Sequence, residues 1–227
     1  MNENWPEAYK KGVKDFYGRD FLVSPAVLIP RPETEAAIDE ALLLAGKPYL
    51  PGMAAPKRRL PEKPLIVDVG TGSSCIAATL KLEIPEAKVI GLDISEEALA
   101  VARENAKRLG AEVKFLQSDL LKSYQEKMPD VVVANLPYVD KEWEWLDKKA
   151  LGFEPSVALY AEKHGLALIF ELIDELFKLS LEAESQKALW LLLEADPCQH
   201  TDIIKYATRH GFVHQKTSGF ALVFERS

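Results

Sequence analysis

Short apolar runs alternate with helical segments from Leu65 to the end of the 227-residue chain, and this pattern restricts the fold most strongly. Runs of strand length occur at Leu65–Val69, Lys88–Asp93, Glu112–Gln117, Asp130–Ala134 and Ala188–Glu194. Helices are expected at about Cys75–Glu83, Ser95–Leu109 with Ser95 as its cap, Gly165–Leu179 and Thr201–His210. Alternating strands and helices form parallel sheets with helices on both faces, so the chain is predicted to be α/β.

Two further runs near the C-terminus predict that the sheet ends in an antiparallel pair. Phe212–Thr217 and Ala221–Glu225 flank Ser218-Gly219, which is typical of a hairpin turn. We therefore expect a Rossmann-like domain over residues 64–227, with a mostly parallel seven-stranded sheet. Residues 1–63 are expected to form an N-terminal segment with one helix over Glu33–Ala45, followed by a proline-rich linker.

Composition and charge argue against several classes of protein. No apolar run approaches the length of a membrane span, and the N-terminus lacks the pattern of a secretory signal. The net charge of −7 argues against nucleic acid as a partner. Cys75 and Cys198 stand far apart, which is typical of free thiols, and the histidines show no metal-ligand spacing with them. We expect a cytoplasmic monomer without a metal site.

A glycine-rich turn follows the first predicted strand and indicates a nucleotide-type ligand. Asp68-Val69-Gly70-Thr71-Gly72 places glycines where the backbone must approach a ligand. Asp93 ends the second strand about 20 residues later, where an acid pairs with ribose hydroxyls. After the third strand, the acid in Ser118-Asp119-Leu120 can accept from the amino group of adenine. These features favour an adenosine-containing ligand, and NAD stays an alternative because Ala77 takes the third-glycine position of a dinucleotide site.

The tetrapeptide Asn135-Leu136-Pro137-Tyr138 follows the fourth predicted strand, at the sheet edge where ligands bind in α/β folds. An amide, a rigid proline and an aromatic ring are suited to hold a planar, uncharged nitrogen. That nitrogen could belong to a side-chain amide or to the amino group of a base. Trp143 and Trp145 on the following loop are expected to pack beneath it, with a place in a peptide groove as the alternative.

The order of these motifs resembles a known family. Asp68-x-Gly70-x-Gly72, Asp93 and Asp119 resemble the S-adenosyl-L-methionine site of class I methyltransferases. Three stretches are similar to the HemK/PrmC family of release factor glutamine methyltransferases. They are Val27-Leu28-Ile29-Pro30-Arg31-Pro32-Glu33-Thr34-Glu35, Asn135-Leu136-Pro137-Tyr138 and Phe153-Glu154-Pro155-Ser156-Val157-Ala158-Leu159. The resemblance implies transfer of a methyl group from S-adenosyl-L-methionine to the glutamine of the Gly-Gly-Gln motif in class I peptide chain release factors.

The resemblance also assigns roles to individual residues. Cofactor binding is expected at Gly70, Thr71, Gly72, Ser73, Ser74, Asp93, Asp119, Leu120 and Asn135. Substrate binding is expected at Asn135, Leu136, Pro137 and Tyr138, of which Asn135, Pro137 and Tyr138 are the predicted catalytic residues. By resemblance, the Asn135 side-chain oxygen accepts one amide N–H and the Leu136 carbonyl accepts the other, which orients the nitrogen for transfer.

The chain departs from the family pattern in three respects. The family tetrapeptide is usually Asn-Pro-Pro-Tyr, whereas Leu136 gives Asn-Leu-Pro-Tyr, which is more typical of rRNA adenine N6-dimethyltransferases. Methylation of an adenine amino group in RNA or DNA is therefore the alternative function. Ser74 replaces a usual glycine. The family's helical N-terminal domain is expected to be largely absent, since the resemblance begins at about Phe21.

Overall fold

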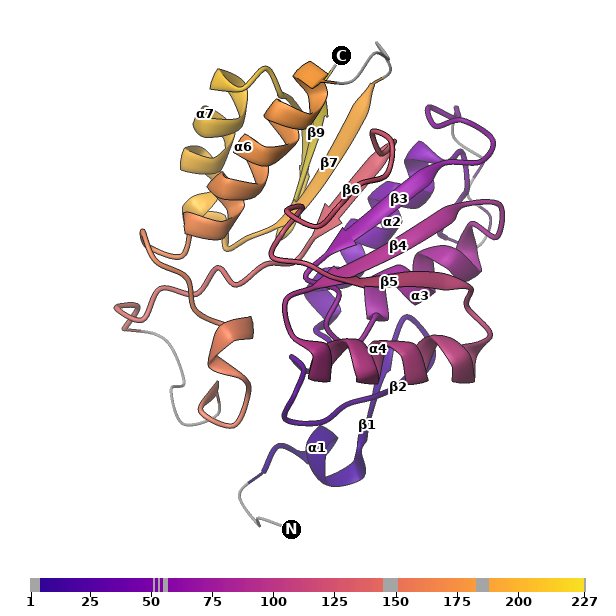
Figure 1. Cartoon of the computed structure of the whole chain (residues 1–227), viewed down its shortest axis with the longest axis vertical. Coiled ribbons are helices and arrows are strands. Elements are labelled where there is room, and N and C mark those ends of the chain that lie inside the picture. The colour runs from indigo at the N-terminus through magenta and orange to yellow at the C-terminus, as the bar shows by residue number, and fades with distance from the viewer. Residues whose placement is uncertain are drawn as a thin grey trace.

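The computed structural model describes residues 5–50, 52, 54, 57–144, 151–182 and 188–226. Its main sheet has seven strands in the order β5-β4-β3-β6-β7-β9-β8 (Figure 1). These are β3 (Leu65–Val69), β4 (Lys88–Asp93), β5 (Val113–Gln117), β6 (Val131–Ala134), β7 (Leu189–Glu194), β8 (Val213–Ser218) and β9 (Ala221–Arg226). Strands β3 to β7 run parallel, and β9 pairs antiparallel with β7 and β8. The predicted mostly parallel sheet with a terminal hairpin is confirmed.

Helices cover both faces of this sheet. One face carries α2 (Glu35–Leu44), α3 (Cys75–Glu83) and α4 (Glu96–Leu109), and the other carries α6 (Ala167–Glu182) and α7 (His200–Arg209). Successive residues of a strand point to opposite faces, so Ile66 packs with α2 and α3 while Val67 packs with α6. Every residue of β3 and β6 is buried, which explains why these strands are continuous apolar runs in the sequence.

The helix ends follow local signals. The Ser95 hydroxyl accepts a hydrogen bond from the backbone N–H of Ala98 at 3.2 Å and so caps α4. Gly110 ends the same helix with φ +69°. Helix α6 begins at Ala167 rather than at Gly165, because residues 163–165 take positive φ values before it.

Among the described residues, no helix has the length and apolar character needed to cross a membrane.

A two-stranded hairpin near the N-terminus was not predicted from the sequence. It consists of β1 (Val13–Phe16) and β2 (Arg19–Leu22), and it follows the short helix α1 (Glu7–Lys11). The turn residues Tyr17 and Gly18 both have positive φ, 51° and 67°, as a tight hairpin turn requires. A tyrosine is rare in that conformation, so the sequence lacks the usual Asn-Gly signal of such a turn.

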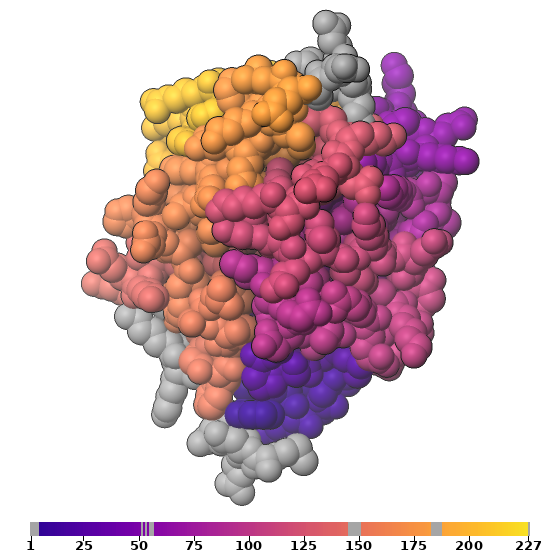
Figure 2. Space-filling view, in the orientation of Figure 1, coloured from indigo at the N-terminus to yellow at the C-terminus, as the bar shows by residue number. Residues whose placement is uncertain are grey.

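The N-terminal segment packs directly on the main domain. Phe16 and Phe21 are buried in one cluster with Ile66 and Ile38, and the Asn105 side chain of α4 holds the backbone of Leu22 through two hydrogen bonds. In Figure 2 this indigo part lies against the magenta α4 region. The boundary after residue 63 stays a prediction, but buried side chains pack across it.

Candidate functional site

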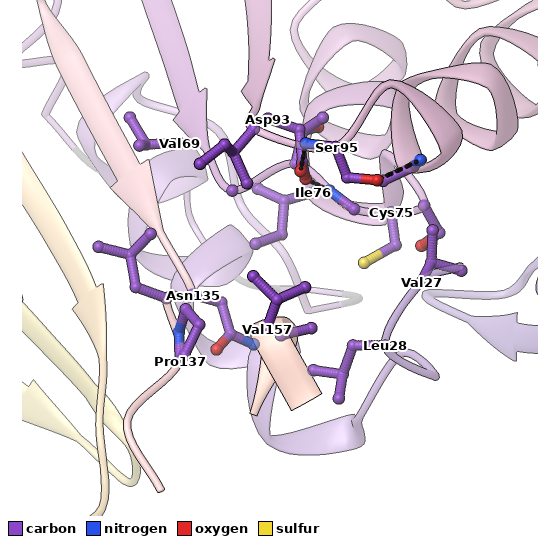
Figure 3. A pocket seen from close by; sticks show the side chains of 18 of the residues that line it. Val27, Leu28, Val69, Cys75, Ile76, Asp93, Ser95, Asn135, Pro137 and Val157 are labelled. Carbon is purple, nitrogen blue, oxygen red and sulfur yellow. Dashed lines mark hydrogen bonds between the residues drawn. The ribbon is translucent and has the colours of Figure 1, made fainter. Parts of the chain in front are cut away.

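A cavity of about 220 Å³ lies at the carboxyl ends of β3, β4, β5 and β6, where open α/β sheets bind ligands. Figure 3 shows Asp93 and Ser95 on one side of it, with Asn135 and Pro137 on the other. The structure places most of the predicted site residues around it, namely Gly70, Thr71, Gly72, Ser73, Asp93, Asp119, Leu120, Asn135, Leu136 and Pro137. We refer to it as the first cavity.

The glycine-rich turn is held from below by a fully buried carboxyl. One oxygen of Asp68 accepts from the Thr71 hydroxyl at 2.6 Å and from the backbone N–H of Ala77 at 3.1 Å. Burial raises the pKa of Asp68 to about 7, although these hydrogen bonds lower it in part. Gly70 has φ +75°, and a Cβ there would lie 3.1 Å from the Leu136 side chain. The turn therefore packs tightly on the tetrapeptide, and a side chain at position 70 would press into it.

Asp93 stands at the end of β4 with both oxygens engaged by backbone. Gly72 N–H donates to one oxygen at 2.8 Å, and Ser95 N–H donates to the other at 2.9 Å. Burial raises the pKa of Asp93, and the backbone hydrogen bonds work against that rise. Each carboxylate oxygen has two lone pairs, so both can accept a further hydrogen bond from a ligand.

The residues after β5 border the cavity in different ways. The Asp119 carboxylate is 2.6 Å from Lys122 Nζ, so its charge is already shared with a lysine. Leu120 is buried at φ +47°, which turns the chain along the cavity wall. Ser74, by contrast, does not border the cavity. It is fully buried at φ +66°, and its hydroxyl has no hydrogen-bond partner among the residues that the structure describes. The predicted role of Ser74 in cofactor binding stays a prediction without a contact to support it.

Asn135 borders the first cavity and also a second cavity of about 190 Å³, whereas Tyr138 borders only the second. The Asn135 side-chain nitrogen donates to the Thr34 hydroxyl at 3.0 Å. Within the described residues, the side-chain oxygen of Asn135 makes no hydrogen bond. The Tyr138 hydroxyl donates to one oxygen of Glu194 at 3.2 Å, and burial next to that carboxyl raises the pKa of Tyr138.

Glu154 joins two sequence stretches that lie more than a hundred residues apart. One oxygen of this buried carboxylate accepts from the backbone N–H of Ile29 at 3.0 Å, and the other pairs with the Arg31 guanidinium. Leu28 and Arg31 from the first stretch and Ala158, close behind Glu154, border both cavities. The Ile-Pro-Arg-Pro and Phe-Glu-Pro stretches therefore build a common wall of the site.

Three residues that hold the tetrapeptide were not predicted as site residues. Thr34 and Glu194 hold the tetrapeptide side chains, and Gln199 donates to the backbone carbonyls of Tyr138 and His164, each at 2.8 Å. Glu194 carried one detectable signal, since it is a charged residue at the carboxyl end of a predicted buried strand. Gln199 carried none, because its partners are set by how the loops cross.

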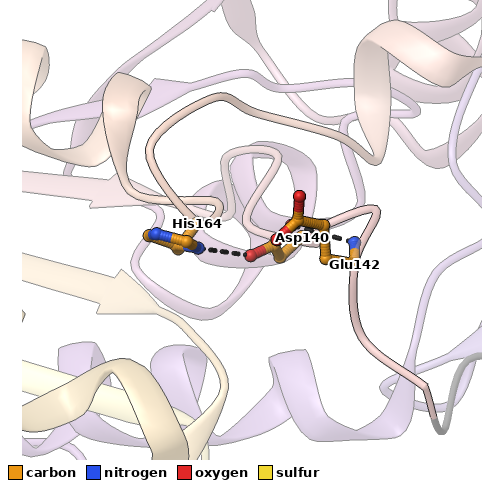
Figure 4. A group of neighbouring side chains, drawn as sticks. All are labelled: Asp140, Glu142 and His164. Atoms are coloured by element: carbon orange, nitrogen blue, oxygen red, sulfur yellow. Dashed lines mark hydrogen bonds and ion pairs between the residues drawn. The ribbon is translucent and has the colours of Figure 1, made fainter.

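Two loop predictions have different outcomes. Trp143 borders the second cavity, as the groove alternative required, while Trp145 lies outside the described residues. On the same loop, Asp140 and Glu142 come close to His164 (Figure 4). Asp140 accepts from the backbone N–H of Glu142 at 3.0 Å and lies 2.8 Å from the His164 ring. These contacts account for the grouping without a metal ion.

Comparisons with known proteins agree with this architecture. A family model described as a methyltransferase domain matches residues 63–184. A release factor glutamine methyltransferase from Koribacter versatilis is 42% identical over 199 residues, covering 85% of this chain and 65% of that protein. One from Bacillus anthracis is 36% identical over 216 residues, covering 89% and 72%. The chain spans 55% to 65% of the length of three such curated relatives.

A solved structure supports the fold independently. A methyltransferase from Pyrococcus furiosus matches with a TM-score of 0.60 at 18% identity, covering 93% of this chain and 91% of that one. At this identity the match concerns the fold alone. The names of the curated relatives favour neither the adenine alternative nor the NAD alternative.

Proposed function

The chain belongs to the family of release factor glutamine methyltransferases, and on that premise we propose that it methylates the Gly-Gly-Gln glutamine of class I peptide chain release factors. The methyl donor in this proposal is S-adenosyl-L-methionine, and the acceptor is the side-chain amide nitrogen. We include in the proposal that the enzyme acts as a monomer in the cytoplasm.

The residues around the first cavity fit S-adenosyl-L-methionine. Gly70 and Gly72 both line this cavity at positive φ, a backbone conformation that residues with side chains rarely adopt. Asp93 offers acceptor lone pairs to ribose hydroxyls, and the residues 118–120 supply a buried leucine and an acid for the adenine. When bound there, the cofactor supplies a methyl group on a positively charged sulfur.

The tetrapeptide accounts for how an amide could be methylated. An amide nitrogen is a poor nucleophile because its lone pair is delocalised into the carbonyl. The Asn135 oxygen would accept one N–H of the substrate amide and the Leu136 carbonyl the other, which holds the nitrogen lone pair toward the first cavity. Alignment of this kind, with water excluded, can supply several kcal/mol of barrier reduction. Tyr138, which borders the second cavity, would flank the substrate side chain.

One observation carries the proposal: Asn135 borders both cavities, with its nitrogen bonded to Thr34 and its oxygen without a partner in the described structure. An acceptor is thereby presented at the junction between a nucleotide-type cavity and a second cavity. A group that must orient a substrate N–H against a methyl donor needs this placement.

The test is methylation of a purified class I release factor, read as the mass gain of one methyl group on the Gly-Gly-Gln peptide. Asn135→Ala should lower kcat roughly 10²–10³-fold, by analogy with loss of one transition-state hydrogen bond, while S-adenosylhomocysteine still binds. Gln215→Ala on the exposed edge strand β8 serves as the control and should leave the rate unchanged.

Two results would contradict the proposal. One is cofactor binding by the wild-type protein without any mass gain on the release factor. The other is incorporation of label from the cofactor into RNA but not into protein, which would favour the adenine alternative.

A further inference from the structure

Behind the tetrapeptide, four side chains from distant parts of the chain form a polar cluster. Asn135 donates to Thr34 at 3.0 Å, and Tyr138 donates to Glu194 at 3.2 Å. Thr34 and Glu194 are 1% and 2% exposed, so their hydrogen bonds are shielded from water. Thr34 lies immediately before α2, whereas Glu194 ends β7.

The contact between Asn135 and Thr34 does not by itself decide which end of the amide faces the substrate. A hydroxyl can donate or accept, and an amide offers a donor nitrogen on one side and an acceptor oxygen on the other. If the Thr34 hydroxyl donated to Asn135, the amide would turn its oxygen inward and its NH₂ group toward the second cavity. A substrate N–H would then face another donor.

The strand order of the sheet places the Glu194 carboxylate where it can determine the orientation of the Asn135 amide. In the β6–β7 ladder Ala134 pairs with Leu193, so Asn135 and Glu194 leave neighbouring parallel strands side by side. Glu194 Oε2 is buried and, within the described part of the chain, makes no hydrogen bond of ordinary geometry. Burial raises the pKa of Glu194, and the nearby Thr34, Tyr138 and Asn135 side chains lower it in part by acting as donors.

An ionised carboxylate can only accept hydrogen bonds. In its ionised form Glu194 attracts the hydroxyl hydrogen of the nearby Thr34, which then offers only the lone pairs of its oxygen to Asn135. The Asn135 NH₂ group must then face Thr34, and its oxygen must face the substrate. In a buried cluster such electrostatic ordering is strong, because little water competes.

We propose that Glu194 is a positioning residue that, through Thr34, fixes the orientation of the Asn135 amide and so presents its oxygen to the substrate. This inference rests on the proposed function for its effect on catalysis, but the orientation it describes can be measured without any turnover. Glu194 does not border the first cavity, so cofactor binding should not depend on it.

The first experiment replaces Glu194 by its neutral isostere, glutamine. Glu194→Gln should lower kcat roughly 10- to 100-fold, part of the loss expected from removing a transition-state contact, with the Kd for S-adenosylhomocysteine unchanged. Glu40→Gln is the matched control: Glu40 is a buried carboxylate of α2, paired with Lys216 at 2.6 Å away from both cavities. It should leave kcat unchanged.

A double-mutant cycle separates orientation from general structural damage. Asn135→Asp alone sets a second carboxylate beside Glu194 and should be nearly inactive. In the double variant with Glu194→Gln, the Thr34 hydroxyl is free to donate to the carboxylate introduced at position 135. The other oxygen of that carboxylate can then accept from the substrate. The double variant should therefore be more active than Asn135→Asp alone, whereas independent sites would multiply their losses.

Thr34 is tested by a matched pair of substitutions. Thr34→Val removes the hydroxyl with almost no change in shape and should lower kcat. Thr79→Val makes the same change at a fully buried hydroxyl in α3, for which the described residues offer no hydrogen-bond partner, so activity should persist.

The orientation itself can be followed by NMR of the Asn135 side-chain NH₂ group, assigned by its absence in Asn135→Ala. Its resonances should move in Glu194→Gln and stay in place in Glu40→Gln, even if the release factor proves not to be the substrate. Unchanged resonances, wild-type kcat in Glu194→Gln, or multiplicative losses in the double variant would each overturn the inference. An inactive wild type with the expected NMR changes would overturn only the proposed function.

Discussion

Replacing Glu154 by alanine tests whether burial, rather than the number of ion pairs, decides what a carboxylate contributes to stability in this fold. Among the described residues, Glu154 makes one ion pair, with Arg31, and accepts from the backbone N–H of Ile29. Its side chain is 4% exposed. Glu126 makes two ion pairs, with Lys88 and Lys114, but lies on the surface.

The expected loss can be built from the two contacts. Without Glu154 the Ile29 N–H has no acceptor, and a buried donor left unpaired costs about 1–3 kcal/mol. The Arg31 side chain is 33% exposed and can turn to water, so its part is about 0–1 kcal/mol rather than the full cost of a buried charge. A total near 2–3 kcal/mol corresponds to a Tm lower by roughly 5–10 °C for a chain of this size.

Thermal unfolding of the wild type, Glu154→Ala and Glu126→Ala gives the comparison. Glu126→Ala should hardly change Tm, because exposed ion pairs are screened by water and salt. S-adenosylhomocysteine should also raise the Tm of Glu154→Ala less than that of the wild type. The reason is that Arg31, which Glu154 holds in place, borders both cavities. Equal Tm values for the two variants, or a larger loss for Glu126→Ala, would refute the reasoning.

Three further substitutions have outcomes that the structure specifies. Gly165→Ala would place a Cβ 1.9 Å from the Tyr138 carbonyl at φ +81°, so Tm should fall by several degrees and methyl transfer should be lost, as measured by melting and by kcat. Ser74→Gly should raise stability by about 1 kcal/mol in urea unfolding, because a serine at φ +66° is strained and its buried hydroxyl has no partner in the described part of the chain. Asp68 has a pKa raised from 3.8 to about 7, so the folded state binds more protons than the unfolded chain between these values, and its stabilising contribution is lost as pH rises through about 7. Asp68→Asn should remove that part of the pH dependence. The prediction would be contradicted if the free energy of unfolding of variant and wild type changed equally with pH between 3.8 and about 7.

The parts of the fold that were predicted correctly depend on neighbours along the chain. The strand Leu65–Val69 and the helix Cys75–Glu83 have the predicted bounds, since an apolar run and a helical period are local properties. Ser95 and Gly110 close α4 through atoms only a few residues away. The β1–β2 hairpin escaped prediction because its turn places Tyr17 at positive φ, a conformation supported by later packing rather than by residue type.

For the candidate site too, local features could be predicted from the sequence and long-range contacts could not. The tetrapeptide, the glycine-rich turn and Asp93 could be located from the sequence, because each follows a predictable strand and parallel strands end at one edge of the sheet. Which side chains meet there could not. Thr34 reaches Asn135 across 101 positions, and Glu194 stands beside it because β7 is the neighbour of β6 in the sheet. Strand and helix preferences are short-range, whereas the partners of a buried polar side chain follow from strand order and loop crossing. The sequence by itself therefore identifies the residues suited to this chemistry. The direction in which the Asn135 amide points is decided by contacts that form only in the folded protein.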